Sequence, residues 1–144
     1  MTSSVQISYL WNDTDLLEVR ILAGNGVFGG TVDVYLSLDA LAKAAEAIDG
    51  FPSNTHDMRE IDFGPAKGLV SLRFFCEGEA GRSFVELSME SQHESYNCAV
   101  NTSPESVKFH AAVEANAVDA FVSDLKKVQA NLSGVAQLSL VSRG

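Results

Sequence analysis

The stretch LEVRILAGNGVFGGTVDVYL, residues 17–36, decides the fold of this chain. Apolar side chains occupy every second position on both sides of a glycine-rich centre: Leu17, Val19, Ile21 and Ala23 before it, and Val32, Val34 and Leu36 after it. An alternation of period two is typical of strands that bury one face. The glycines of residues 24–30 tolerate the positive φ values that tight turns require. The stretch therefore predicts a β-hairpin.

A helix is expected directly after the hairpin, over residues 38–49. Ser37 is a suitable N-cap, and apolar side chains then recur at helical spacing on one face. Gly50 is a typical residue just past a helix end, and Pro52 prevents the helix from resuming. Phe51, between them, is expected to anchor the chain to the core.

The second half of the chain predicts a run of strands and then a second helix. Alternation indicates strands over about 60–63, 68–76, 82–90 and 107–115, with the turn 77–81 joining the middle two as a hairpin. The polar segment 91–106 contains at most a short strand near 96–100. Asn116 is a suitable N-cap for a helix over 117–129 with an apolar stripe. Short strands are expected at Val5–Tyr9 and around Leu138 and Leu140.

The order of these elements is hairpin, helix, β-meander, helix. That order predicts an α+β fold with a mainly antiparallel sheet, and with the helices 38–49 and 117–129 packed on one face of it. No composition break or linker interrupts the 144 residues, so we expect residues 1–144 to form a single domain.

The net charge of the chain limits the classes of molecule that it is expected to bind. The chain has 10 lysines and arginines and 19 aspartates and glutamates, which gives a formal net charge of −9. This excess of acid argues against binding to nucleic acid or to anionic membranes, because both depend on basic side chains. The first residues contain no lysine or arginine, and no apolar segment of signal-peptide length follows. We therefore expect a cytoplasmic protein.

The cysteines and histidines predict no metal site. Cys76 and Cys98 are too far apart for a typical ligand pair, and we interpret them as reduced thiols in or near the sheet core. His56, His93 and His110 lie outside ligand spacing of one another and of the cysteines. We expect neither a metal nor a cofactor.

No motif in the chain predicts catalysis. Gly24, Gly26 and Gly29 match the dinucleotide-binding spacing, but a strand follows them where that site needs a helix. We interpret these glycines as the tip of a hairpin, where Phe28 is exposed as a contact residue. The chain contains no nucleophile elbow, zinc-protease motif or phosphate-binding loop, and we expect it not to be an enzyme.

Acidic side chains gather on the hairpin predicted around residues 77–81. They are Glu77, Glu79, Glu86 and Glu90. Glu86 and Glu90 share the strand face opposite Val85, Leu87 and Met89. An acidic sheet face of this kind favours a basic protein partner, because complementary charge steers association. The alternative is that these charges serve only solubility.

Several segments of the chain resemble a group of small bacterial proteins of unknown function that includes the WapI-type immunity proteins. The resemblance lies in YLSLDAL (residues 35–41) leading to DGFP (49–52), in GLVSLRF (68–74), and in ANAVDAFVSDL (115–125). It implies an α+β protein that either neutralises a toxin by binding it or has no characterised activity. It assigns no functional residue to a position of this chain.

These observations favour a non-enzymatic protein-binding module, with an immunity-type inhibitor of a toxin as its most specific form. Two alternatives remain open. The first is a small-molecule-binding protein or enzyme with a pocket between sheet and helices, to which Trp11, Tyr35, Arg73 or His110 would contribute polar groups. The second is a self-associating structural protein, since uncovered edge strands favour a homodimer.

Overall fold

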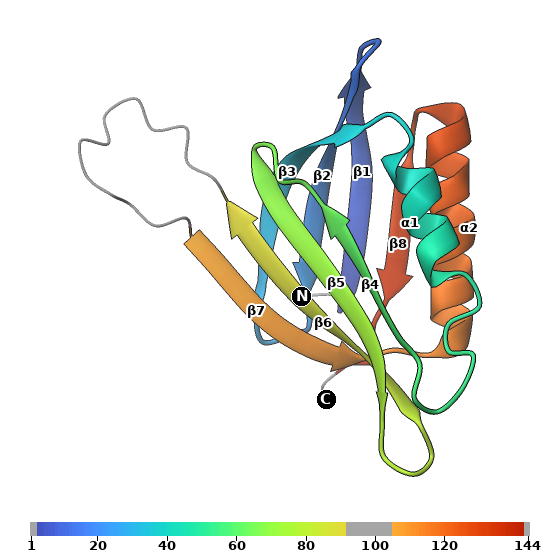
Figure 1. Ribbon diagram of the computed structural model, residues 1–144. Coiled ribbons are helices and arrows are strands. Elements are labelled where there is room, and N and C mark those ends of the chain that lie inside the picture. The colour runs from blue at the N-terminus through green and yellow to red at the C-terminus, as the bar shows by residue number, and fades with distance from the viewer. Residues whose placement is uncertain (1–2, 92–104, 143–144) are drawn as a thin grey trace.

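The computed structural model describes residues 3–91 and 105–142 and places eight strands and two helices in them (Figure 1). Their bounds, in chain order, are β1 (Ser4–Asn12), β2 (Leu16–Gly24), β3 (Gly29–Ser37), α1 (Ala40–Ile48), β4 (Met58–Phe63), β5 (Gly68–Glu77), β6 (Arg82–Ser91), β7 (Glu105–Ala112), α2 (Ala115–Asn131) and β8 (Val135–Ser139). All strand pairings are antiparallel. The predicted α+β class is confirmed.

The strands form two sheets rather than one. Sheet A has the order β3-β2-β1-β8, and sheet B has the order β4-β5-β6-β7. The sheets meet where β3 packs against β5 and β6. Gly68 lies at this junction, where an added Cβ would overlap the Val32 side chain and lie 3.1 Å from the carbonyl oxygen of Asp33. The junction therefore requires a residue without a side chain.

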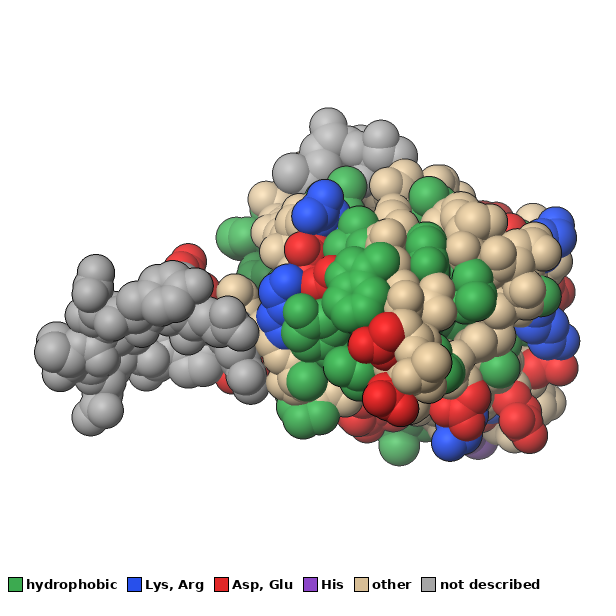
Figure 2. Space-filling model, turned by 90° about the horizontal axis from the view of Figure 1, so that it is seen from above, with side chains coloured by type: hydrophobic (Ala, Val, Ile, Leu, Met, Phe, Trp, Pro, Cys, Tyr) green, Lys and Arg blue, Asp and Glu red, His purple; other side chains and the backbone are tan. Residues whose placement is uncertain are grey.

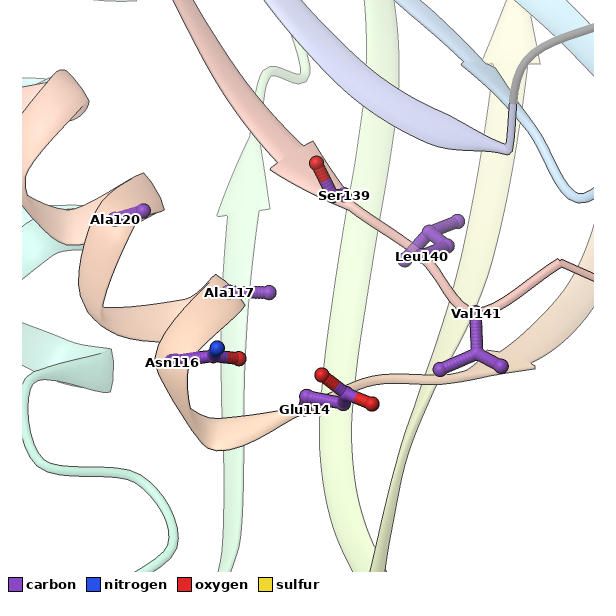
Figure 3. A pocket seen from close by; sticks show the side chains of 7 residues that line it. All are labelled: Glu114, Asn116, Ala117, Ala120, Ser139, Leu140 and Val141. Atoms are coloured by element: carbon purple, nitrogen blue, oxygen red, sulfur yellow. The ribbon is translucent and has the colours of Figure 1, made fainter.

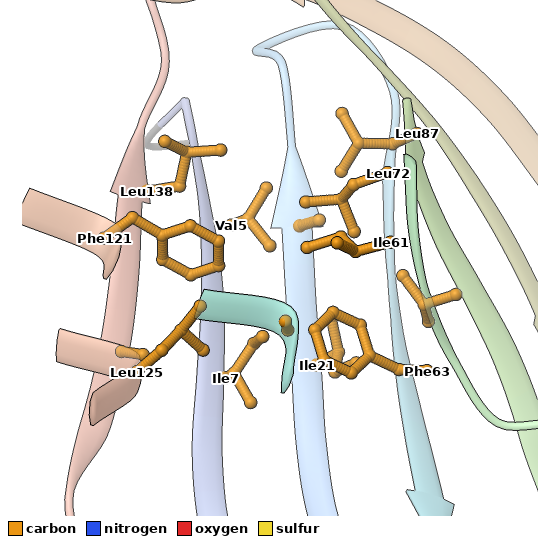
Figure 4. Packing of buried hydrophobic residues seen from close by; sticks show 14 of the residues in the cluster. Val5, Ile7, Ile21, Ile61, Phe63, Leu72, Leu87, Phe121, Leu125 and Leu138 are labelled. Atoms are coloured by element: carbon orange, nitrogen blue, oxygen red, sulfur yellow. The ribbon is translucent and has the colours of Figure 1, made fainter. Parts of the chain in front are cut away.

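The two helices close the opposite, open side of this pair of sheets. α1 packs against β4 and α2 against β8, and the helices contact each other (Figure 1). The space enclosed by sheets and helices is filled by apolar side chains from every layer, among them Ile21, Leu72, Phe121 and Leu138 (Figure 4). The strands thus form two sheets, where the sequence predicted a single sheet with both helices on one face. The sheets are separate because β3, the edge strand of sheet A, packs against β5 and β6 and does not extend their ladder; a bridge joins Tyr35 to Ala66 in the β4–β5 loop.

Both helices begin at residues other than those predicted. α1 starts two residues later than expected, because its first helical hydrogen bond runs from the Lys43 amide to the Asp39 carbonyl. The Ser37 hydroxyl donates to Asp39 instead of capping the backbone. α2 starts earlier, because the Glu114 carbonyl already accepts hydrogen bonds from the amides of residues 117 and 118. Asn116 therefore lies within the first turn and is not the N-cap.

The hairpin of residues 17–36 forms as predicted, with Gly24 opposite Gly29. Its turn depends on Asn25, which is 1% exposed. The side-chain Oδ1 of Asn25 accepts hydrogen bonds from the backbone amides of Val27 and Phe28 at 2.9 Å, and its side-chain Nδ2 donates to the His110 carbonyl at 3.0 Å. The turn is thereby tied to β7 of the other sheet.

The segment after α1 is held by an ion pair between Asp57 and Arg59. The Arg59 guanidinium contacts Asp57 at 2.9 Å and also donates to the Asp49 carbonyl at the end of α1. Hydrogen bonds from Arg59, and then from the Ser53 amide and hydroxyl, hold the pKa of Asp57 below its ordinary value. Phe51 is buried beside this pair, as predicted, and its ring lies 5.5 Å from that of Phe74.

Replacement of Asp57 with asparagine is expected to lower the free energy of unfolding by about 1.5–3 kcal/mol at neutral pH, the usual contribution of hydrogen bonds to a charged group. A carboxyl group with a lowered folded pKa stabilises the fold above its unfolded pKa and loses that effect as the pH falls through the folded value. The difference between wild type and variant in urea unfolding should therefore shrink below about pH 3.8, the ordinary pKa of aspartate. The exposed Asp119→Asn variant is the control, and a difference independent of pH would contradict the assignment.

Candidate functional site

The outer face of sheet B carries the side chains that the sequence assigned to partner binding. Figure 1 shows no helix or strand of the described part of the chain in front of this face. Val85, Leu87 and Met89 point into the core and are at most 2% exposed, so Glu86 and Glu90 project outward between them. The predicted alternation of β6 is confirmed.

The predicted acidic residues do not form one continuous patch. Glu77 and Glu79 lie at the end of the β5–β6 hairpin and are exposed. Glu86 lies on the sheet face and forms ion pairs with Arg73 at 3.5 Å and with Lys108 at 3.8 Å. Glu90 is half-buried further along β6, opposite Leu69 and Ser106. The structure brings Glu86 and Glu90 onto one face and places Glu77 and Glu79 at its end.

Phe28 is distant from these glutamates in the sequence and belongs to the other sheet. It lies in the turn between β2 and β3 of sheet A, and 56% of its surface is exposed. The predicted exposure of Phe28 at a hairpin tip is confirmed.

A group of aromatic and arginine side chains occupies the outer face of sheet B beside the glutamates. The rings of Phe75 and Phe84 stack with their centroids 5.7 Å apart. The Arg73 guanidinium lies over Phe75 at 4.6 Å, and that of Arg82 lies over Phe84 at 5.4 Å. Met58, opposite Phe75 on β4, is 64% exposed. We call these five residues the aromatic–arginine cluster.

Sequence reasoning missed this cluster, although a signal for it exists. Phe75 follows the buried Phe74, and Phe84 precedes the buried Val85. Period-two alternation therefore places both rings on the outer face, and the cross-strand register of β5 and β6 then sets them side by side. Arginine, methionine and aromatic side chains are the types enriched at protein interfaces.

The four side chains proposed for a pocket lie on two different surfaces. Trp11 and Tyr35 contact each other edge to face, with ring centroids 6.1 Å apart, at the end of sheet A. Arg73 and His110 lie on the outer face of sheet B, where both are cross-strand neighbours of Glu86. None of the four lies between sheet and helices, where the described apolar core is. His93 and Cys98 lie outside the described residues, while Cys76 is half-buried on β5.

A partly buried ion pair lies beside Tyr35. Glu18 is 6% exposed, and its carboxylate accepts a hydrogen bond from the Lys67 ammonium at 2.6 Å. This hydrogen bond raises the pKa of Lys67 above its ordinary value, and the attraction of the Glu18 charge adds to it. Lys67 also lies over the Tyr35 ring at 5.2 Å, and the Tyr35 amide donates to the Ala66 carbonyl at 3.1 Å. The loop between β4 and β5 is thus fastened to β3.

The described residues form several surface depressions of about 300–550 Å³, and two of these border a helix. One, of about 440 Å³, lies between the start of α2 and the end of β8 (Figure 3). Its polar side chains are Glu114, Asn116 and Ser139, and Figure 3 shows them spread around the depression rather than converging on one point. The other, of about 550 Å³, lies between α1 and the β4–β5 loop. Both are open to solvent.

Two further observations concern the described residues only. They contain no group of three or more histidine, cysteine or acidic side chains placed to hold a metal ion. No helix among them is long and apolar enough to cross a membrane.

Because no comparison finds a similar protein, a function can be inferred only from the fold and the surface. The chain matches no protein-family model, no curated protein and no solved structure with significance.

Proposed function

We propose that this protein is a protein-binding module that docks a partner through the outer face of sheet B. The observation that carries the proposal is the aromatic–arginine cluster, because stacked aromatic rings with arginines over them form a preorganised contact surface on a rigid sheet. Glu77 lies opposite Arg82 of the cluster, Glu79 lies in the adjoining turn, and Glu90 lies further along β6 on the same face. The cluster would supply affinity, and the glutamates would steer the approach of a basic partner.

The resemblance to the WapI-type immunity proteins favours a toxin domain as that partner. In this form of the proposal the protein acts in the cytoplasm and inhibits by binding, without catalysis. The net charge of −9 supports a basic protein rather than nucleic acid or an anionic membrane as the counterpart. The proposal needs neither a metal nor a cofactor, and it does not require a homodimer.

The double variant Phe75→Thr/Phe84→Thr tests the proposal. Threonine favours strands, so sheet B should persist without the stacked rings. The partner is first captured from the native host by the wild type, purified, and then titrated against each variant. We expect the affinity of the double variant to fall by about thirtyfold, which corresponds to the loss of one hot spot.

The matched control is Leu22→Thr, which removes an apolar side chain that is 48% exposed on the outer face of sheet A. It should bind as the wild type does. A second variant, Glu77→Gln/Glu79→Gln/Glu86→Gln/Glu90→Gln, should slow association more than it speeds dissociation. Equal affinity of the wild type and the Phe75→Thr/Phe84→Thr variant would refute docking through this face.

A further inference from the structure

We infer that the groove between α1 and the β4–β5 loop is a second binding site, which takes a short peptide segment with one aliphatic side chain flanked by lysine or arginine. The groove has a volume of about 550 Å³. The groove differs from the aromatic–arginine cluster, because its lining comes from α1, the β1–β2 turn, β2, β3, β4 and the loop after β4. The two regions adjoin at β4, where Glu60 lies opposite Arg73.

The walls of the groove are apolar. Ala40, Ala44 and Ala47 line it from α1, where three successive positions of one helix side bear only a methyl group. Ile61, which is 5% exposed, lines it from β4, and Leu16, which is 39% exposed, lines it from the start of β2. An aliphatic side chain placed there would bury apolar surface against all three elements, which is the main source of affinity for such a segment.

Acidic side chains outnumber basic ones around the groove. Asp15, Glu60 and Asp62 line it and are exposed. Within the described part of the chain, no basic side chain forms an ion pair with any of the three. Lys43 is the basic side chain of the lining, and its ammonium already pairs with Asp39 at 3.1 Å. Lysine or arginine on either side of the buried aliphatic residue would complement this charge.

Hydrophobic side chains also gather on the surface next to the groove. Figure 2, which looks onto this end of the molecule, shows hydrophobic side chains gathered near its centre with acidic side chains beside them. Tyr35 lines the groove, and its ring contacts Trp11, which is 40% exposed. Trp11 is the single tryptophan of the chain, so its fluorescence reports on this end of the molecule.

The probe for this inference is the synthetic peptide Gly-Ser-Lys-Leu-Arg-Lys-Ser-Gly. It is titrated into the full-length protein, with Trp11 emission and the backbone amide signals followed by NMR. We expect saturable shifts at residues of α1 and β4 that line the groove, together with a change in Trp11 emission. A peptide with serine in place of leucine should bind more weakly, and one with glutamate in place of its basic residues should not bind.

Two variants of the protein identify the site. Glu60→Lys/Asp62→Lys should weaken binding of the basic peptide about fivefold to thirtyfold, as expected when two exposed attractions become repulsions. Ala47→Phe fills the groove from an exposed position of α1 and should abolish the shifts. The control for charge is Glu46→Lys/Asp119→Lys, which changes net charge equally away from the groove, and the control for size is Ala130→Phe on α2.

Equal weakening by both charge-reversal pairs would mean that only net charge attracts the peptide and would overturn the inference. Shifts confined to the outer face of sheet B would overturn it as well, while leaving the proposed function intact. The absence of any shift would also overturn it. Loss of partner binding in Phe75→Thr/Phe84→Thr, with peptide binding unchanged, would show that the two sites are distinct, as the inference requires.

Discussion

Replacement of Phe121 with alanine is expected to lower the free energy of unfolding by about 3–5 kcal/mol, the usual cost of removing a buried phenylalanine from a core. Phe121 is fully buried on the inner side of α2, and Figure 4 shows its ring among side chains from β1 and β8. The helix has no second aromatic residue to fill the space. The loss would therefore leave a cavity where α2 closes the open side of the two sheets.

Urea unfolding followed by circular dichroism measures this effect. Ala120→Ser is the control, because Ala120 is exposed at the preceding position of the same helix and its substitution should change stability by less than about 0.5 kcal/mol. A loss below about 1 kcal/mol for the Phe121→Ala variant would mean that α2 does not contribute to the core as described.

Lys67→Met is expected to lower the free energy of unfolding by roughly 2–4 kcal/mol, because it leaves the Glu18 carboxylate buried without its counterion. The estimate lies below that for a fully enclosed pair, since 35% of the Lys67 side chain is exposed. The double variant Glu18→Met/Lys67→Met should recover most of the loss, because two apolar side chains leave no buried charge. A loss in the double variant equal to the sum of the losses in Lys67→Met and in the single variant Glu18→Met would contradict a direct interaction.

The same pair predicts a dependence on alkaline pH. A lysine whose folded pKa is raised stabilises the fold fully below its unfolded pKa and loses that effect as the pH rises through the folded value. The difference in unfolding free energy between the wild type and Lys67→Met should thus be constant at neutral pH and decrease above about pH 10.5, the ordinary pKa of lysine. Chemical unfolding at a series of pH values checks this.

Local patterns in the sequence predicted the individual elements well. The alternation on both sides of residues 24–30 gave the correct hairpin, because a two-residue period and a glycine-rich turn depend only on neighbouring residues. The strand around Leu138 was also expected, and it forms as β8. Its pairing with β1 was not predicted, since no local pattern indicates which distant strand is the neighbour. The pairing places β8 at the edge of sheet A, beside β1.

Local alternation also predicted part of the candidate site. Alternation placed Glu86 and Glu90 correctly on the outer face of β6. It could not show that Arg73 and Lys108 neutralise Glu86, because those ion pairs depend on the register of three strands. The contact between Trp11 and Tyr35 likewise arises from the pairing of three strands at the end of sheet A.

Amide hydrogen exchange of the protein, free and bound to its captured partner, tests docking through sheet B most directly. The proposal predicts protection on binding in β5 and β6, centred on the amides around Phe75 and Phe84, and no change in β1 and β2 of sheet A. Protection confined to sheet A or to α2, with β5 and β6 unchanged, would contradict it.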